Sequence, residues 1–214
     1  MINLIDCTLR DGGYYNQWDF SRNLIDAYLE AMPAAGVDVI ELGFRSMKNA
    51  GFKGALGFTS DNFLRTLPLP SGTTIGVMVN GSELVDDTPL GVALEKLFPE
   101  DAEQSPVDMV RIACHAHEWD EILPAAQWLK SRGYIVGFNL MQVADRTESE
   151  LLSLARAASR YPLDVLYFAD SMGSMNPAQC TSVIQTLRQE WRGELGIHAH
   201  DNMGVALQNT LTAV

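Results

Sequence analysis

The chain has 214 residues, of which 47% are hydrophobic and 20% are charged, so a packed core is expected and wholesale disorder is excluded. A net charge of -12 argues against nonspecific binding to nucleic acid or to an anionic membrane. The chain has 3 cysteines without CxxC spacing and no apolar run long enough to span a bilayer, which indicates a protein of the reducing cytoplasm.

Short runs rich in valine and isoleucine alternate along the chain with longer segments whose apolar residues recur at helical spacing. The expected strands cover residues 2–7, 37–43, 74–79, 107–113, 135–140, 165–169 and 195–200. The expected helices include residues 24–34, 119–132, 148–159 and 177–191. Nearly continuous apolar strands separated by helices predict a parallel sheet that is covered on its faces.

Polar residues follow nearly every expected strand, as at Arg10-Asp11 and Asp170-Ser171. An open doubly wound sheet concentrates its site at one switch point, whereas a barrel gathers residues from all its strands at one face. We therefore predict an α/β fold of the TIM (β/α)8 type, one domain over residues 1–214 with about seven βα units visible. The eighth unit is expected to be missing at the C-terminal end, with a partner chain, a further domain or a second copy closing the barrel.

His198 and His200 form the sharpest local signal, because alternate residues of a strand project to the same side and both imidazoles can reach one ion. Imidazole suits manganese, iron, cobalt or zinc, and Asp11 after the first strand can add a carboxylate. Histidines that bond to the backbone of a half-buried strand are the alternative. At a second pair, His115 and His117, we expect His117 at the surface and His115 facing a substrate.

Arg10 presents a rigid fork of donors that cannot lose its charge, so beside a metal it would stabilise an oxyanion or enolate. An ion pair with Glu41 is the purely structural alternative. The two roles are compatible, because a catalytic arginine needs an orienting carboxylate. A Schiff-base aldolase is disfavoured, since no lysine lies inside an expected strand.

The segments DCTLRDGG (6–13) and HAHDNMG (198–204) resemble the DRE-TIM metallolyase superfamily, which includes 3-hydroxy-3-methylglutaryl-CoA lyase. The segments VRIACHAHE (110–118) and ADSMG (169–173) are most similar to its 4-hydroxy-2-oxovalerate aldolase branch. The resemblance implies a TIM barrel and a divalent metal, either manganese or magnesium, with zinc as the alternative.

By position, the resemblance implies that Asp11, His198 and His200 are the metal ligands. It places the family's signature arginine at Arg10 and its signature glutamate at Glu41. The implied activity is a carbon–carbon lyase, an aldolase, that acts on a 2-oxo acid or a related carbonyl substrate through a metal-stabilised enolate.

The chain departs from this family at Tyr14, where related aldolases have an acid–base histidine. Tyr14, His115 or a group outside the chain is therefore the expected acid–base residue, and Asn139 and Ser171 are expected substrate contacts. The expected partner is a small 2-oxo acid or aldehyde, not a nucleic acid or a membrane. A Claisen-type acyl-CoA condensing enzyme of the isopropylmalate synthase type and a non-catalytic barrel domain are the alternatives.

Overall fold

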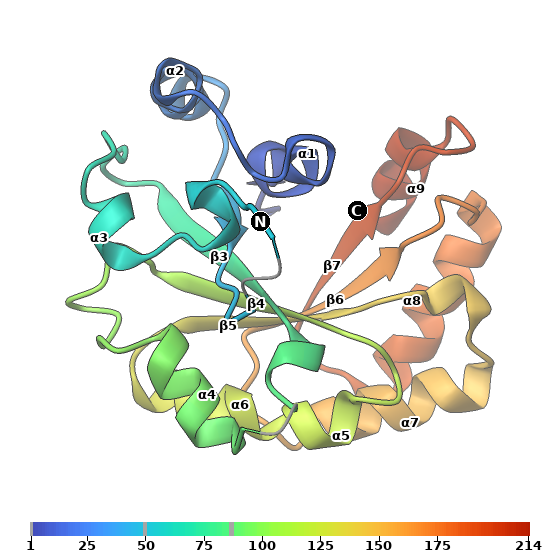
Figure 1. The fold of residues 1–214 in the computed structure, drawn as a ribbon. Helices are drawn as coiled ribbons and strands as arrows, with labels where there is room; N and C mark the ends of the chain where they lie inside the picture. The colour runs from blue at the N-terminus through green and yellow to red at the C-terminus, as the bar shows by residue number, and fades with distance from the viewer. Residues whose placement is uncertain (1, 49–50, 86–87) are drawn as a thin grey trace.

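The computed structural model describes residues 2–48, 51–85 and 88–214, which form one curled parallel sheet with helices around it (Figure 1). The sheet has 7 strands in chain order, each paired in parallel with the next, from Ile5↔Val39 to Asp170↔Ala199. The strands are β1 (Ile5–Asp6), β2 (Val39–Phe44), β3 (Thr74–Asn80), β4 (Met109–Cys114), β5 (Ile135–Leu140), β6 (Val165–Asp170) and β7 (Glu194–Ala199). The predicted α/β fold of the TIM-barrel type is confirmed, as a half-barrel.

Helices and short 3-10 turns connect the strands, and α4 to α8 follow one side of the curled sheet (Figure 1). The helices are α1 (Thr8–Asn16), α2 (Arg22–Ala34), α3 (Asp61–Leu64), α4 (Leu90–Leu97), α5 (Trp119–Ile122), α6 (Pro124–Ser131), α7 (Glu148–Ala158), α8 (Pro177–Glu190) and α9 (Ala206–Ala213). The 3-10 turns are η1 (Ala55–Gly57), η2 (Gly81–Glu83) and η3 (Val143–Asp145). No helix among the described residues combines the length and the apolarity needed to cross a membrane.

The prediction of a strand over residues 2–7 is wrong, because β1 covers only Ile5–Asp6 and helix α1 begins at Thr8. The carboxylate of Asp6 accepts hydrogen bonds from Thr8 N at 2.9 Å and from Thr8 Oγ1 at 3.1 Å. Such a bond satisfies a backbone donor that the start of a helix leaves open, which favours an early start. Asp11 therefore lies in the first turn of α1 and not in a loop after the strand.

The expected helix over residues 119–132 is divided into α5 and α6 at Pro124. Proline has no backbone N–H and crowds the carbonyl four residues before it, so it begins a helix more readily than it continues one. Helices α7 and α8 begin where they were expected, at Glu148 and at Pro177. Each is preceded by the first residue of a capping box, Thr147 for α7 and Asn176 for α8.

The barrel interior differs from the main core, which lies between the sheet and the helices. One small interior cluster contains Val39, Met109 and Tyr167, and another contains Phe44, Met78 and Ala113. Three charged side chains are also buried in the interior: Arg10, Glu41 and Arg111. A buried charge is costly unless it is paired, so each of these three side chains requires a partner of opposite charge.

Candidate active site

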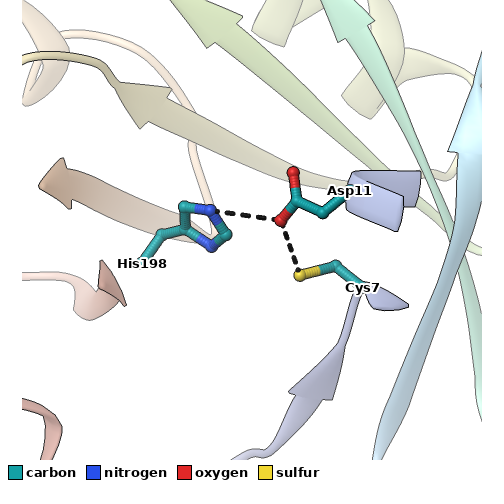
Figure 2. Close-up of side chains that lie close together, drawn as sticks. All are labelled: Cys7, Asp11 and His198. Atoms are coloured by element: carbon teal, nitrogen blue, oxygen red, sulfur yellow. Dashed lines mark hydrogen bonds and ion pairs between the residues drawn. The ribbon is translucent and has the colours of Figure 1, made fainter. Parts of the chain in front are cut away.

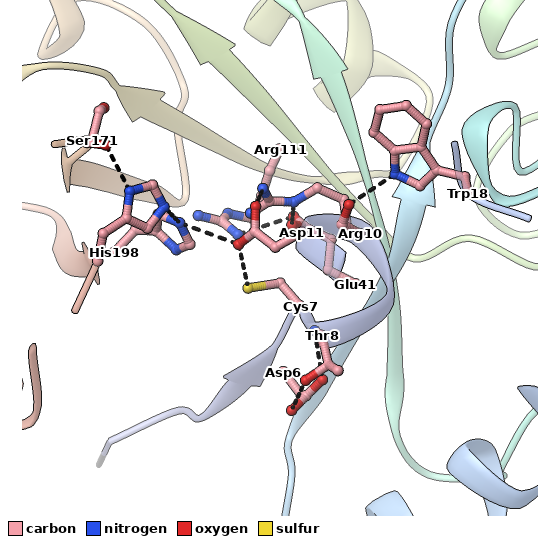
Figure 3. A network of polar contacts seen from close by, with 11 residues as sticks. Asp6, Cys7, Thr8, Arg10, Asp11, Trp18, Glu41, Arg111, Ser171 and His198 are labelled. Carbon is pink, nitrogen blue, oxygen red and sulfur yellow. Dashed lines mark hydrogen bonds and ion pairs between the residues drawn. The ribbon is translucent and has the colours of Figure 1, made fainter. Parts of the chain in front are cut away.

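Glu41 lies at the centre of the buried charges and is fully buried on β2 (Figure 3). Its Oε1 accepts from Arg10 Nε at 2.7 Å, and its Oε2 accepts from Arg111 Nη1 at 3.0 Å. Burial alone would raise the pKa of Glu41, but the guanidinium groups of Arg111 and Arg10 outweigh burial and lower it. Glu41 is therefore an anion at neutral pH that orients two arginines.

Arg10 projects from α1, with a side chain that is 5% exposed. Burial would lower its pKa, but the carboxylates of Glu41 and Asp11 raise it further, so the guanidinium keeps its charge. Its Nη1 donates to Asp11 Oδ1, while its Nη2 is buried without a protein partner. Buried polar atoms are normally satisfied, so an unpaired donor inside a barrel mouth is suited to an oxygen of a bound ligand.

Asp11, His198 and Cys7 form a compact cluster beside Arg10 (Figure 2). Asp11 Oδ2 lies 3.4 Å from His198 Nε2 and 3.4 Å from Cys7 Sγ. Burial, together with the positive charge of Arg10, lowers the pKa of His198 to about 4. The imidazole is therefore neutral at pH 7, which is the form that binds metal. Burial raises the pKa of the Cys7 thiol to about 12, so Cys7 donates to Asp11 as a neutral thiol in this structure.

His200 extends this cluster, because its Nε2 lies 3.1 Å from His198 Nε2. Its Nδ1 lies 2.7 Å from the carbonyl oxygen of Ser171, which directs Nε2 toward His198. A hydrogen bond from the second ring nitrogen to a carbonyl is the usual support of a metal-binding histidine. The donor atoms of Cys7, Asp11 and His198 lie within 4.8 Å of one another, and His200 adds an imidazole nitrogen beside that of His198, so the side chains gathered here are of the kinds that bind a divalent ion.

Tyr14 and His115, the expected acid–base residues, do not belong to the cluster of Cys7, Asp11 and His198. The Tyr14 side chain is 62% exposed, and its ring packs edge-on against Trp18 at a centroid distance of 4.9 Å. Partial burial raises the pKa of Tyr14, with Arg10 acting in the opposite direction, so the hydroxyl keeps its proton at neutral pH. His115 Nδ1 lies 3.2 Å from Gln142 Oε1.

The two expected substrate contacts, Asn139 and Ser171, differ in whether their side-chain oxygen already has a hydrogen-bond partner. Asn139 is buried on β5 and its Oδ1 has no protein partner. Ser171 Oγ already accepts from the backbone N–H of Gln142 at 3.0 Å. Asn139 can therefore still bind a ligand through its carbonyl oxygen, whereas Ser171 chiefly supports its neighbours. His117 is 78% exposed, as expected of a surface residue.

Sequence reasoning missed Arg111, which holds the second oxygen of Glu41 and stacks over the ring of Tyr167 at 4.2 Å. The ring itself fits because Gly196 has no side chain: a Cβ there would lie 2.3 Å from Tyr167 Cδ1. A charged residue inside the apolar run MVRIAC was the signal that could have identified Arg111.

Comparisons with known proteins find similarity to an HMGL-like family model and to proteins named as aldolases. A family model described as HMGL-like matches residues 110–214. The chain is 30% identical to 4-hydroxy-2-oxovalerate aldolase 2 of Nocardia farcinica, over 99% of this chain and 59% of that protein. The chain thus spans about three fifths of the length of the curated relatives it matches.

Solved structures agree with this comparison. The N-terminal domain of a proposed aldolase from Bacteroides vulgatus superposes with a TM-score of 0.83 at 31% identity, covering 99% of this chain and 69% of that one. The HMG-CoA lyase of Brucella melitensis superposes with a TM-score of 0.72 at 15% identity, covering 99% of this chain and 76% of that one. This second similarity concerns the fold alone.

Proposed function

Because the chain belongs to the HMGL-like family, we propose that it carries the metal-binding and substrate-activating residues of a carbon–carbon lyase of the aldolase class. The substrate class is a small 2-oxo acid or a related carbonyl compound. The observation that carries the proposal is the unpaired, buried Nη2 of Arg10, next to Asp11 and the histidine pair.

Asp11, His198 and His200 would hold a divalent ion, with manganese or magnesium the first ions to test. When bound, such an ion supplies a Lewis acid that neutralises negative charge on a carbonyl oxygen. Asn139 Oδ1 is buried without a protein partner, which supports a role for Asn139 as the acceptor of a hydrogen bond from a substrate hydroxyl or amide group. Ser171 is assigned to the support of His200.

Arg10 is proposed to donate Nη2 to the oxygen on which negative charge develops when the carbon–carbon bond breaks. The donor is preorganised, because Glu41 holds Nε and Arg111 holds Glu41 from the other side. A preorganised donor of this kind typically lowers the barrier by about 3 to 4 kcal/mol.

The proton of the substrate hydroxyl needs a base, and His115 is the proposed one. Tyr14 keeps its proton at neutral pH, since its pKa is raised, and is therefore proposed as the separate donor that protonates the enolate carbon; solvent then restores the proton to Tyr14 and removes the one held by His115. Imidazole is the commonest general base in enzymes, which supports His115 in the other role. His115→Gln should lose turnover while its metal content stays the same, and a variant that keeps full turnover would contradict this assignment.

The decisive experiment measures release of a 2-oxo acid from a panel of 4-hydroxy-2-oxo acids, with Mn²⁺ or Mg²⁺ present. Arg10→Ala should lower kcat by about 100- to 1000-fold while bound metal, measured by elemental analysis, stays the same. Arg160→Ala is the matched control, because Arg160 is exposed on the surface. Full turnover in Arg10→Ala would contradict the proposal. Condensation of an acyl-CoA with a 2-oxo acid, in place of cleavage, would replace it with the Claisen-type alternative.

We also propose that a further segment or a partner chain completes the barrel between β7 and β1. Leu207 and Leu211 lie one turn apart on α9 and are 73% and 67% exposed, and no residue of β7 is fully buried, unlike the residues of the central strands. An eighth βα unit would cover both features. The free thiols of Cys7, Cys114 and Cys180 support a cytoplasmic location.

A further inference from the structure

Cys7 lies within the ligand cluster, yet the proposed function leaves it without a role. Its Sγ, Asp11 Oδ2 and a ring nitrogen of His198 all lie within 4.8 Å of one another (Figure 2). A thiol alone would mean little, but this one is joined by a carboxylate and an imidazole that come from two ends of the sheet.

The local backbone brings Cys7 to this place. Cys7 is the residue before helix α1, and Asp11 follows it by one helical turn, with Asp11 N donating to Cys7 O at 2.8 Å. The Cys7 side chain makes no capping hydrogen bond to the helix. Sγ is instead directed at Asp11 Oδ2, so both side chains face the same side of the first turn (Figure 3).

The separations of Asp11 Oδ2 from its two neighbouring donor atoms match the edges of a small coordination polyhedron. Bond lengths of about 2.3 Å for zinc–sulfur and about 2.0 to 2.1 Å for zinc–nitrogen give neighbouring ligand atoms about 3.3 to 3.6 Å apart in a tetrahedron. The separation is 3.4 Å from Cys7 Sγ to Asp11 Oδ2 and 3.4 Å from that oxygen to His198 Nε2. The second imidazole, His200, is 3.1 Å from the first.

The arginine beside the cluster selects which carboxylate oxygen is available. Arg10 Nη1 donates a hydrogen bond to Asp11 Oδ1. The other carboxylate oxygen, Oδ2, is the atom that lies beside both Cys7 Sγ and His198 Nε2. The Nη2 of this guanidinium, which the proposed function assigns to a substrate oxygen, lies buried beside the cluster without a protein partner. The same guanidinium would compensate the additional negative charge of a thiolate.

We propose that Cys7 is a metal ligand, bound through its thiolate together with Asp11 and His198, and that it biases the site toward Zn²⁺ or Co²⁺ over Mg²⁺. Thiolate is a soft ligand that zinc and cobalt accept and magnesium avoids. As the metal–sulfur bond forms, the thiol proton leaves to solvent and the hydrogen bond from Cys7 to Asp11 is lost. This inference rests on the metal site of the proposed function and adds a ligand to it.

The test is a titration of the metal-free full chain with Co²⁺, followed by absorption spectroscopy. Wild type should show a near-ultraviolet thiolate-to-cobalt charge-transfer band as well as the visible ligand-field bands. Cys7→Ala and the closer mimic Cys7→Ser should lose the first and keep the second. Cys180→Ala is the control, because Cys180 Sγ contacts Asn209 O between α8 and α9 and lies outside the cluster.

Calorimetric binding of Zn²⁺ and Mg²⁺ gives a second readout. Cys7→Ala should weaken Zn²⁺ binding by at least the roughly 10- to 100-fold that loss of a supporting partner costs, and leave Mg²⁺ binding unchanged. Ligand-field bands in wild type without a charge-transfer band would overturn the role of Cys7 and leave the metal site intact. A wild-type chain that binds none of these ions would overturn both the ligand and the metal site.

Discussion

Replacing Glu41 by glutamine tests the central claim that one buried carboxylate holds two arginines in place. Glutamine keeps the shape and one acceptor oxygen but removes the negative charge between Arg10 and Arg111. Removing one member of a buried charge cluster typically costs about 3 to 5 kcal/mol, because the remaining charges stay buried without compensation. We expect the lower end for Glu41→Gln, about 3 kcal/mol, or a Tm lowered by about 6 to 12 °C for a domain of this size.

Urea unfolding followed by circular dichroism measures this loss, and pH tests its cause. The folded-state pKa of Glu41 is lowered, so its stabilising effect is complete above the ordinary carboxyl pKa of about 4.3 and is lost as the pH falls through the folded-state value. The difference between wild type and Glu41→Gln should therefore be full at pH 7 and shrink below about pH 4.5. Glu30→Gln on exposed α2 is the control and should unfold like wild type. Equal stabilities at pH 7, or a gap that persists unchanged into acid, would refute the reasoning.

Two further tests concern packing in the barrel interior, and a third concerns a helix cap. Tyr167→Leu removes the ring under Arg111 and should cost about 1 to 2 kcal/mol in urea unfolding, whereas Tyr167→Phe keeps the stacking and should cost less. Gly196→Ala places a Cβ 2.3 Å from Tyr167 Cδ1 and should lower the free energy of unfolding by about 1 to 3 kcal/mol. The control Gly91→Ala adds a Cβ to α4 where the space is open and should raise that free energy by up to about 1 kcal/mol. Equal changes in the two variants would contradict the packing argument. Thr147→Ala removes the capping box of α7 and should lower the unfolding free energy by about 1 kcal/mol; an unchanged urea midpoint would show that the cap contributes nothing.

The sequence by itself was sufficient for the order of the seven strands, for four of the helical segments between them and for the strand ends at which polar residues gather. Buried parallel strands are apolar on both faces, so β3 to β6 stand out from the helices without knowledge of the fold. The alternation of a strand predicted that His198 and His200 lie on the same side; in the structure His198 belongs to β7 and His200 follows the end of that strand, and their Nε2 atoms lie 3.1 Å apart.

Only the tertiary structure decided which side chains meet. Arg10 and Arg111 lie 31 and 70 positions from Glu41 along the chain, and the curvature of the sheet, not any local pattern, brings them to its two oxygens. Cys7 directly precedes α1, which begins at Thr8 where Asp6 accepts the backbone hydrogen bond, and its thiol thereby comes within reach of Asp11 one helical turn later. A periodic pattern can be recognised from residues that are close together in the sequence. The partner of a buried charge, in contrast, depends on which strand end, distant in the sequence, lies beside it in the fold.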